Sequence, residues 1–181
     1  MVSMFQQSEN LAIQGNLFLK LAVVITVLAT TSGCSKPAPA PTIALAVNPT
    51  EGGGETLSFT ARYSEPNESI EQAGVLINHG ATGVGGCYVI YLSSTNSAHL
   101  VKDEGISSFQ LDPKSDTGVE NSQCILDPHG FSVSRDANEL TVRAAVRFKR
   151  AFGGTKNIYL YADSKDGGKT GVEKKGTWVI P

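Results

Sequence analysis

Apolar and polar residues alternate along several segments of the chain beyond residue 42. The alternation is clearest over residues 56–63 and 140–149, where nearly every second position is apolar. A period of two is typical of a β-strand that buries one face. We therefore predict strands in both segments. Shorter runs of the same kind predict further strands over residues 43–47, 74–78, 87–92, 99–101, 122–126, 131–134, 157–162 and 177–180.

Clusters of glycine, proline and asparagine separate these segments. They are Asn48-Pro49, Gly52–Gly54, Glu65–Asn67, Gly83–Gly86, Asp112-Pro113, Asp127-Pro128, Gly153-Gly154 and Asp166–Gly168. Glycine permits positive φ and proline fixes φ near −65°, so each cluster predicts a chain reversal. Many short strands, frequent turns and no helical period predict an all-β, antiparallel sandwich of the immunoglobulin-like or fibronectin III-like kind over residues 43–181.

The first 33 residues have the organisation of a secretory signal. Lys20 precedes an apolar run over residues 21–29, and residues 30–33 are small. A basic segment, a short apolar segment and small residues before a cut site are the three parts of such a signal. The apolar run has nine residues, whereas a membrane-spanning helix needs about 20. We expect a signal peptide over residues 1–33 and not a permanent transmembrane helix.

The signal ends at Cys34, within a segment that resembles the lipobox of bacterial lipoproteins. Thr31-Ser32-Gly33-Cys34 matches that motif at the small residue before the cysteine, although Thr31 stands where leucine is usual. The resemblance implies that Cys34 is lipidated by diacylglycerol and then N-acylated. Ser35 after the cysteine implies the outer membrane of a Gram-negative cell, with a periplasmic or surface location. The alternative is an ordinary signal with an incidental cysteine.

Residues 34–42 then predict a tether. Prolines alternate with alanines from Pro37 to Pro41, and such a sequence adopts extended polyproline II geometry as a semi-rigid spacer. A lipidated cysteine with two or more acyl chains is sufficient for stable anchoring. The membrane is therefore the first expected partner.

Composition narrows the choice of further partners. The net charge is −2, and a near-neutral balance argues against nucleic acid. Beyond Cys34 the only cysteines are Cys87 and Cys124. In an oxidising compartment two cysteines predict one disulfide, whose 37-residue separation corresponds to about 3–4 kcal/mol in the chain-entropy model. A metal pair or a catalytic cysteine is the weaker alternative, because no histidine or cysteine stands at ligand spacing.

Several short motifs together resemble a known family. They are Cys87-Tyr88-x-x-Tyr91, Leu100-Val101-x-Asp103, Asn121-Ser122-Gln123-Cys124, the segment from Phe152 to Asp163, and the ending Gly176-Thr177-Trp178-Val179-Ile180-Pro181. They resemble a bacterial secreted Ig-like β-sandwich domain that recurs as an appended module in large extracellular proteins. The resemblance implies the fold and an exported location, and it brings no catalytic residues. This chain departs from the pattern in its single copy, its lipid anchor and its charged segment over residues 163–175.

Motifs of catalysis are missing from the sequence. It has no Gly-x-Ser-x-Gly elbow, no phosphate-binding loop and no His-Glu-x-x-His. We expect His79, His99 and His129 to face solvent. Asp163-x-x-Asp166 lacks the further carboxylates of a calcium loop. We therefore predict a non-enzymatic protein with no catalytic residues, no metal and no cofactor.

Two groups of residues are candidates for ligand contact. Arg143, Arg147 and Lys149 would share the polar face of one strand, where they could attract acidic glycans or anionic lipids. The alternative is a solvated face whose charges discourage edge-to-edge pairing. The second group is four tyrosines, Tyr88, Tyr91, Tyr159 and Tyr161, of which Tyr159 and Tyr161 point away from their apolar neighbours.

Trp178 lies in the last predicted strand, and we expect it to anchor the core because an aromatic side chain of this size buries a large area. A ligand platform is the alternative. The sequence thus favours a lipid-anchored, non-enzymatic binding or structural module of the bacterial cell envelope, with an envelope protein or polysaccharide as partner. A carbohydrate-binding module that uses surface tyrosines is the alternative, and an enzyme ranks third.

Overall fold

The computed structural model describes residues 45–64, 70–136 and 138–181, and in these segments every regular element except one 3₁₀ turn is a β-strand. They belong to one unit that spans residues 38–181. The predicted signal peptide, Cys34, the tether and the turn at 65–67 lie outside the described residues. No described helix is long and apolar enough to cross a membrane.

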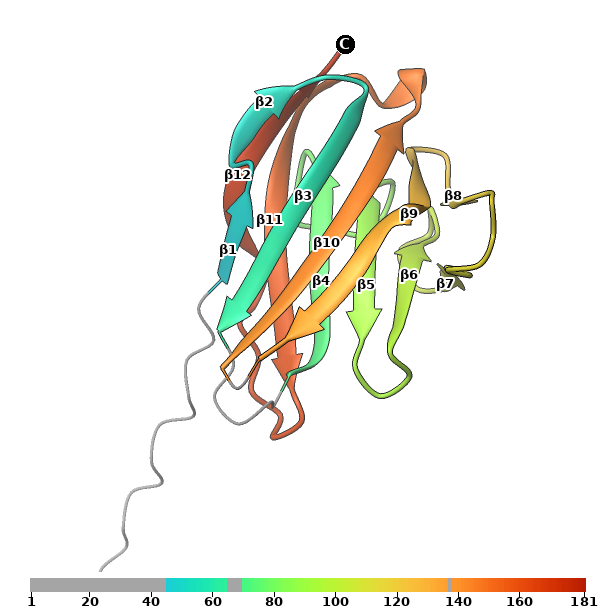
Figure 1. Ribbon diagram of the computed structural model, residues 1–181. Helices are drawn as coiled ribbons and strands as arrows, with labels where there is room; N and C mark the ends of the chain where they lie inside the picture. Colours follow the sequence, from blue (N-terminus) through green and yellow to red (C-terminus); the bar gives the residue numbers. More distant parts are fainter. Residues whose placement is uncertain (1–44, 65–69, 137) are drawn as a thin grey trace, which may run out of the picture. The chain divides into compact units, whose positions relative to one another are not determined.

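The first sheet has five antiparallel strands in the order β1-β3-β10-β9-β8 (Figure 1). They are β1 (Leu45–Asn48), β3 (Thr56–Ser64), β10 (Glu139–Phe148), β9 (Cys124–Arg135) and β8 (Val119–Glu120). The alternation that predicted β3 and β10 is also the alternation of their burial. One face of this sheet lies against the core and the other faces solvent.

The second sheet has seven strands in the order β2-β12-β11-β4-β5-β6-β7. They are β2 (Glu51–Gly53), β12 (Glu173–Ile180), β11 (Gly154–Ser164), β4 (Ile70–Asn78), β5 (Cys87–Leu92), β6 (Ser97–Val101) and β7 (Ser108–Gln110). All neighbours are antiparallel except β2 and β12, which run parallel. A single cluster of buried side chains from both sheets forms the core.

Two sheets around one core confirm the predicted all-β sandwich. The neighbours also define its class: β1-β3-β10-β9 corresponds to strands A-B-E-D of an immunoglobulin domain. β12-β11-β4-β5-β6 corresponds to G-F-C followed by C′ and C″, the two strands that variable-type domains add. The described chain is therefore an immunoglobulin-like sandwich with a variable-type strand order.

Most predicted strands are present with shifted ends, but one predicted turn is wrong. Asp127-Pro128 does not reverse the chain, because the segments predicted at 122–126 and 131–134 belong to one strand, β9. Asp127 pairs with Ala145 and Ser132 with Arg143, so four residues of β9 face Ala144 alone. Proline has no N–H to donate to a neighbouring strand, and a bulge of this kind accommodates it.

The glycines at 52–54 also do more than turn the chain. Residues 51–53 form β2, which pairs with the end of β12. The Trp178 ring lies against Gly52, where a Cβ atom would approach it to 2.4 Å, so only glycine fits. Trp178 packs against the core as a half-buried residue and donates from Nε1 to the carbonyl of Gly54 at 3.0 Å. This supports its predicted anchoring role.

The predicted disulfide is present and crosses the sandwich. Cys87 begins β5 in the second sheet and Cys124 begins β9 in the first, with 5.6 Å between their Cα atoms. Both residues are fully buried. A second link joins the sheets elsewhere in the core, where the hydroxyl of Tyr63 on β3 donates to the carbonyl of Gly74 on β4 at 3.0 Å. The two sheets are thus held by directional bonds as well as by apolar burial.

Removal of the disulfide tests its contribution. We expect the double variant Cys87→Ala/Cys124→Ala to lose about 3 kcal/mol of unfolding free energy, because the unfolded chain regains the entropy of an open loop. Urea unfolding of the full chain measures this loss. A reductant should lower the stability of the wild type and leave that of the double variant unchanged; equal stabilities without reductant would contradict the prediction.

Candidate functional site

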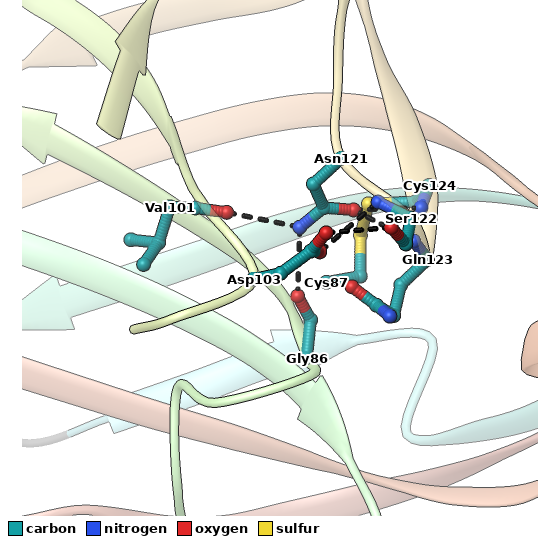
Figure 2. Close-up of a disulfide and its surroundings, with 8 residues drawn as sticks. All are labelled: Gly86, Cys87, Val101, Asp103, Asn121, Ser122, Gln123 and Cys124. Carbon is teal, nitrogen blue, oxygen red and sulfur yellow. Dashed lines mark hydrogen bonds between the residues drawn. A yellow bond between two sulfur atoms is a disulfide. The ribbon is translucent and has the colours of Figure 1, made fainter. Parts of the chain in front are cut away.

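The Asn121-Ser122-Gln123-Cys124 motif is a structural joint beside the disulfide (Figure 2). The buried amide of Asn121 donates to the carbonyls of Gly86 and Val101, both at 2.9 Å. Its oxygen accepts from the backbone N–H groups of Gln123 and Cys124, also at 2.9 Å. The side chain therefore uses both its donors and its acceptor to join the starts of β5 and β9 to the end of β6.

Asp103 completes the joint from outside. Its carboxylate accepts from the backbone N–H of Ser122 at 3.0 Å and from the Ser122 hydroxyl. This contact explains why the Leu100-Val101-x-Asp103 motif and the Asn121 motif occur in one chain: they are two halves of a hydrogen-bonded cluster (Figure 2). Most polar groups of the cluster bind one another, but Gln123 Oε1 is buried and has no hydrogen-bond partner among the described residues.

The structure brings the predicted basic residues together in part: Arg147 and Lys149 line one hollow with Arg150, and Arg143 lies further back along β10. Arg143 and Arg147 are exposed on the outer face of the first sheet, as predicted, and neither forms an ion pair among the described residues. Lys149 lies beyond the end of β10 and pairs with Glu120 at 3.2 Å. Their strand is central, between β3 and β9, so these charges do not protect a sheet edge either.

Carboxylates also lie on this face. Glu139, at the start of β10 itself, pairs with Arg62 at 3.7 Å. Asp116 and Asp127 line the same hollow as Arg147. Spacing along β10 alone could not show Asp116 and Asp127, because they come from other parts of the chain. The face has mixed charge, which weakens the attraction for a polyanion.

The tyrosines divide between the core and the surface. Tyr91 is buried in the core, where its hydroxyl donates to Asn96 Oδ1 at 2.9 Å, so its proposed ligand contact is wrong. Tyr159 and Tyr161 are half-buried on the outer face of the second sheet, while Ile158, Leu160 and Ala162 are buried. Their side chains thus share the outward face that the sequence predicts.

Gly74 gives this outer face its shape. It lies on β4 between β11 and β5, opposite Tyr161 on one side and Ile90 on the other. A Cβ atom at Gly74 would lie 2.9 Å from Tyr88 Cε2 and 3.3 Å from Tyr161 Cδ1. The two rings therefore lean over the glycine from both sides, in space that any other residue would occupy.

Leu76 is the second floor residue of this surface. It lies between Tyr159 and Tyr88 on the neighbouring strands, and it is buried although it belongs to the outer side of the sheet. We call the surface formed by Gly74, Leu76, Tyr88, Tyr159 and Tyr161 the tyrosine face. Ile90, which is half-buried opposite Gly74, extends this surface along β5 with an apolar side chain.

Polar groups stand at both ends of the tyrosine face along β11. At one end the Asn157 amide donates to the Tyr159 hydroxyl at 3.0 Å. At the other end the Tyr161 hydroxyl donates to Asp163 Oδ2, which also pairs with Lys169 at 3.1 Å. The second oxygen, Asp163 Oδ1, is buried and has no hydrogen-bond partner among the described residues.

The hydroxyls of Tyr88 and Tyr161 stay protonated well into alkaline solution. Burial, reinforced by the nearby charge of Asp163, raises the pKa of Tyr88 to about 12. Burial and the hydrogen bond to Asp163 also raise the pKa of Tyr161. The tyrosine face thus presents neutral phenols at physiological pH.

A loop over residues 79–86 closes the tyrosine face near Tyr88. Gly83 comes so close that an added Cβ atom would lie 3.1 Å from Tyr88 Cδ1. His79 fixes the start of the loop, because its Nε2 accepts from Lys156 Nζ at 2.7 Å and its carbonyl accepts from Asn157 at 2.8 Å. No sequence pattern indicates this pairing, because the two residues lie 77 positions apart.

Lys156 is an unusual residue in this corner. It is 3% exposed, and no described carboxylate pairs with it. Its ammonium group donates to Gly153 O at 2.9 Å and lies 4.4 Å from the Phe152 ring centroid. Burial lowers the pKa of Lys156. Hydrogen bonds and the ring quadrupole stabilise the charge in place of an acid.

One hydroxyl–imidazole pair has a geometry that catalysis could use. Ser97 Oγ lies 2.8 Å from His99 Nε2, and Ser108 Oγ lies 3.2 Å from His99 Nδ1. Burial lowers the pKa of His99, which is half-buried and not solvent-facing as predicted. The Ser97 hydroxyl is itself buried and shared with Thr95 at 2.6 Å. No carboxylate orients this imidazole among the described residues, so the pair lacks the third member of a triad.

Among the described residues, His79, His129 and the turn over residues 163–166 do not come together as a metal site. His79 and His129 are exposed, and His129 lies 3.9 Å from Asp116. In the described part of the chain, no three histidine, cysteine or acidic residues are grouped closely enough to hold a metal ion. Asp163 uses one oxygen for Tyr161 and Lys169.

Comparisons with known proteins give no family. No family model matches the chain, and no curated protein matches it. One solved chain is similar at 7% identity with a TM-score of 0.35, covering 77% of this chain and 99% of that chain. It comes from a structure described as concerning T cell specificity and activation by the bacterial superantigen toxic shock syndrome toxin-1. At that score the similarity carries no argument, and the bacterial Ig-like resemblance stays a prediction.

The joint at Asn121 can be tested by truncation. We expect Asn121→Ala to cost about 3 kcal/mol of unfolding free energy, because buried donors and acceptors lose their partners. Ser122→Ala, which removes an exposed hydroxyl from the same motif, should cost less than about 1 kcal/mol. Urea unfolding of both variants with the disulfide intact makes the comparison; similar losses would show that Asn121 has no special role.

The raised phenol pKa values predict a loss of stability in alkali. Above pH 10 tyrosines of the unfolded chain release protons that Tyr88 in the folded chain keeps until about pH 12. The contribution of Tyr88 to the unfolding free energy should therefore be constant below pH 10. Above it, the free energy should fall by up to about 1.4 kcal/mol per pH unit for each such tyrosine. Urea unfolding from about pH 9 to about pH 11.5 should give a shallower fall for Tyr88→Phe than for the wild type, whereas parallel curves would refute this.

Proposed function

We propose that the protein is a lipid-anchored, non-enzymatic binding module of the bacterial cell envelope. Its sandwich would be attached to the outer membrane through Cys34 and the tether over residues 34–42. The observation that carries the binding role is the tyrosine face, where Tyr88, Tyr159 and Tyr161 are only half-buried on the outside of a finished core. Aromatic side chains left partly exposed in one place are typical of contact surfaces.

The position of the first described strand supports this proposal. Leu45 pairs with Tyr63 near the end of β3, whereas Thr56 at the start of β3 pairs with Arg147 near the end of β10. The chain thus enters the sandwich at the end far from the disulfide, which lies where β9 begins beside Phe148 (Figure 1). An attachment at one end leaves the outer faces of both sheets free to bind.

An enzyme is the weaker candidate. The Ser97–His99 pair would supply a nucleophile and a base, but the hydroxyl is buried and shared with Thr95. A hydrolase also needs donors aimed at a developing oxyanion, and nothing in the described sequence around this pair provides them. A binding or structural role uses the observed surfaces more directly.

Metabolic labelling of cells with radioactive palmitate tests the anchor. We expect the full-length protein to be labelled and to sediment with membranes, and Cys34→Ala to be unlabelled, because Cys34 is the proposed acceptor of the lipid. The variant Cys87→Ala/Cys124→Ala is the matched control and should still be labelled. An unlabelled wild type would overturn the proposal of a lipid anchor.

A further inference from the structure

We infer that two copies of this chain associate through two neighbouring loops, residues 79–86 and 102–107, which we call the loop pair. Their association lies beyond the proposed function, because it uses a surface other than the tyrosine face and needs no lipid anchor. Three features of the loop pair carry the inference: exposed apolar side chains, a fixed backbone beneath them, and unpaired charges of opposite sign.

Exposed apolar side chains gather at the loop pair. Val84 is 58% exposed, Ile106 is 90% exposed, and Phe109, which follows in β7, is 41% exposed. They are three of the five large apolar side chains that are exposed among the described residues. Gly105 brings the two loops together, because a Cβ atom there would lie 3.0 Å from Val84 Cγ2. Exposed apolar residues that gather in one place, and do not occur singly, are typical of an interaction site.

Hydrogen bonds hold the loop pair in this exposed arrangement. The buried amide of Asn78 donates to the carbonyl of Val84 at 3.1 Å and so fixes the first loop. The N–H of Gly85 donates to the carbonyl of Asp103 at 2.9 Å, which links the two loops. Gly105 turns the second loop with a φ of +78°. Because the loops are ordered before any contact, association costs little conformational entropy.

A hollow beside the loop pair is lined by charged side chains of both signs. It has a volume of about 320 Å³, and its charged residues are Lys102, Asp103, Glu104, Glu120 and Lys149. Three of these charges are satisfied within the chain. Lys149 pairs with Glu120 at 3.2 Å, and the Asp103 carboxylate accepts two hydrogen bonds from Ser122 (Figure 2). Lys102 and Glu104 are left, and neither forms an ion pair among the described residues.

One unpaired cation and one unpaired anion in the same loop make the surface self-complementary. The Lys102 ammonium lies 4.7 Å from the centroid of the Phe109 ring. A hydrogen bond from the Ser107 hydroxyl holds the pKa of Glu104 below its usual range, so this carboxylate is ionised at neutral pH.

A second copy of the chain satisfies both charges at once. In a contact with two-fold symmetry, the same patch of each copy is used, so Lys102 of one copy can face Glu104 of the other. An acidic or a basic partner would satisfy only one of the two charges. Ile106, which lies between these loops and solvent, supplies the apolar centre of the contact.

The test uses the full-length protein in density-matched detergent micelles and sedimentation equilibrium from micromolar to millimolar concentration. We expect a reversible equilibrium between monomer and dimer, because a contact as small as two loops belongs to the weak class of interfaces. Ile106→Asp places a charge at the centre of the contact and should weaken association at least about tenfold. Val179→Asp is the matched control: it changes an exposed valine on β12, beyond β11 and β4, and should associate within about twofold of the wild type.

Charge exchange tests the pairing itself. Lys102→Glu and Glu104→Lys should each weaken association, because like charges would then face one another across the two-fold axis. The double exchange Lys102→Glu/Glu104→Lys places opposite charges in swapped positions and should recover most of the wild-type association. A residue with a merely structural role would not be rescued in this way. Thermal unfolding of each variant confirms that the sandwich is intact.

Three results would overturn the inference. The first is a wild type that stays monomeric up to millimolar concentration. The second is an Ile106→Asp variant that associates as tightly as the wild type, since the contact would then lie elsewhere. The third is a double exchange that associates no more tightly than either single exchange.

Discussion

The sandwich depends on the place where its two sheets are joined by bonds with fixed geometry. Apolar burial holds two sheets together but does not by itself fix their relative position. The disulfide between Cys87 and Cys124 fixes one point, and Asn121 beside it ties the adjoining loops with four hydrogen bonds. The strand β5 that the disulfide holds pairs with β4, and β4 pairs with β11. The tyrosine face is formed across these three strands, with Gly74 between Tyr88 and Tyr161.

The central strands could be predicted because their own residues determine their burial. In β3 and β10 each second side chain enters the core, so period two is visible without knowledge of any partner. Two edge strands, β2 and β8, could not be predicted, because residues 51–53 and 119–120 have no pattern of their own and are strands only through pairing. The edge strand β1, in contrast, overlaps the segment predicted at 43–47. Pro128 was misread for a related reason: a bulge in β9 and a turn use the same residues, and only the pairing with β10 distinguishes them.

The candidate site shows the same division. The shared direction of Tyr159 and Tyr161 follows from strand geometry and was predicted correctly. The burial of Tyr91, the floor at Gly74 and the contact of Lys156 with His79 all depend on which strands are neighbours. The basic strip is altered by a carboxylate that spacing along β10 cannot reveal, because Asp127 on the adjacent strand β9 lines the same hollow as Arg147. Residues far apart in sequence create the site, so only the topology reveals it.

Under the proposed lipid anchor, the short outermost strands have a consequence for copies that meet on a membrane. β1, β2, β7 and β8, which end the two described sheets, have two to four residues each. Molecules confined to a plane meet copies of themselves far more often than molecules free in solution, and a long open strand would then recruit a neighbour's strand and start aggregation. The short outermost strands cover these edges only in part, because β8 pairs with Ile125 and Leu126 of β9 and no described strand pairs with residues 127–135 on that side. The bulge at Pro128 interrupts this open stretch, and such an irregularity opposes pairing with a neighbour's strand.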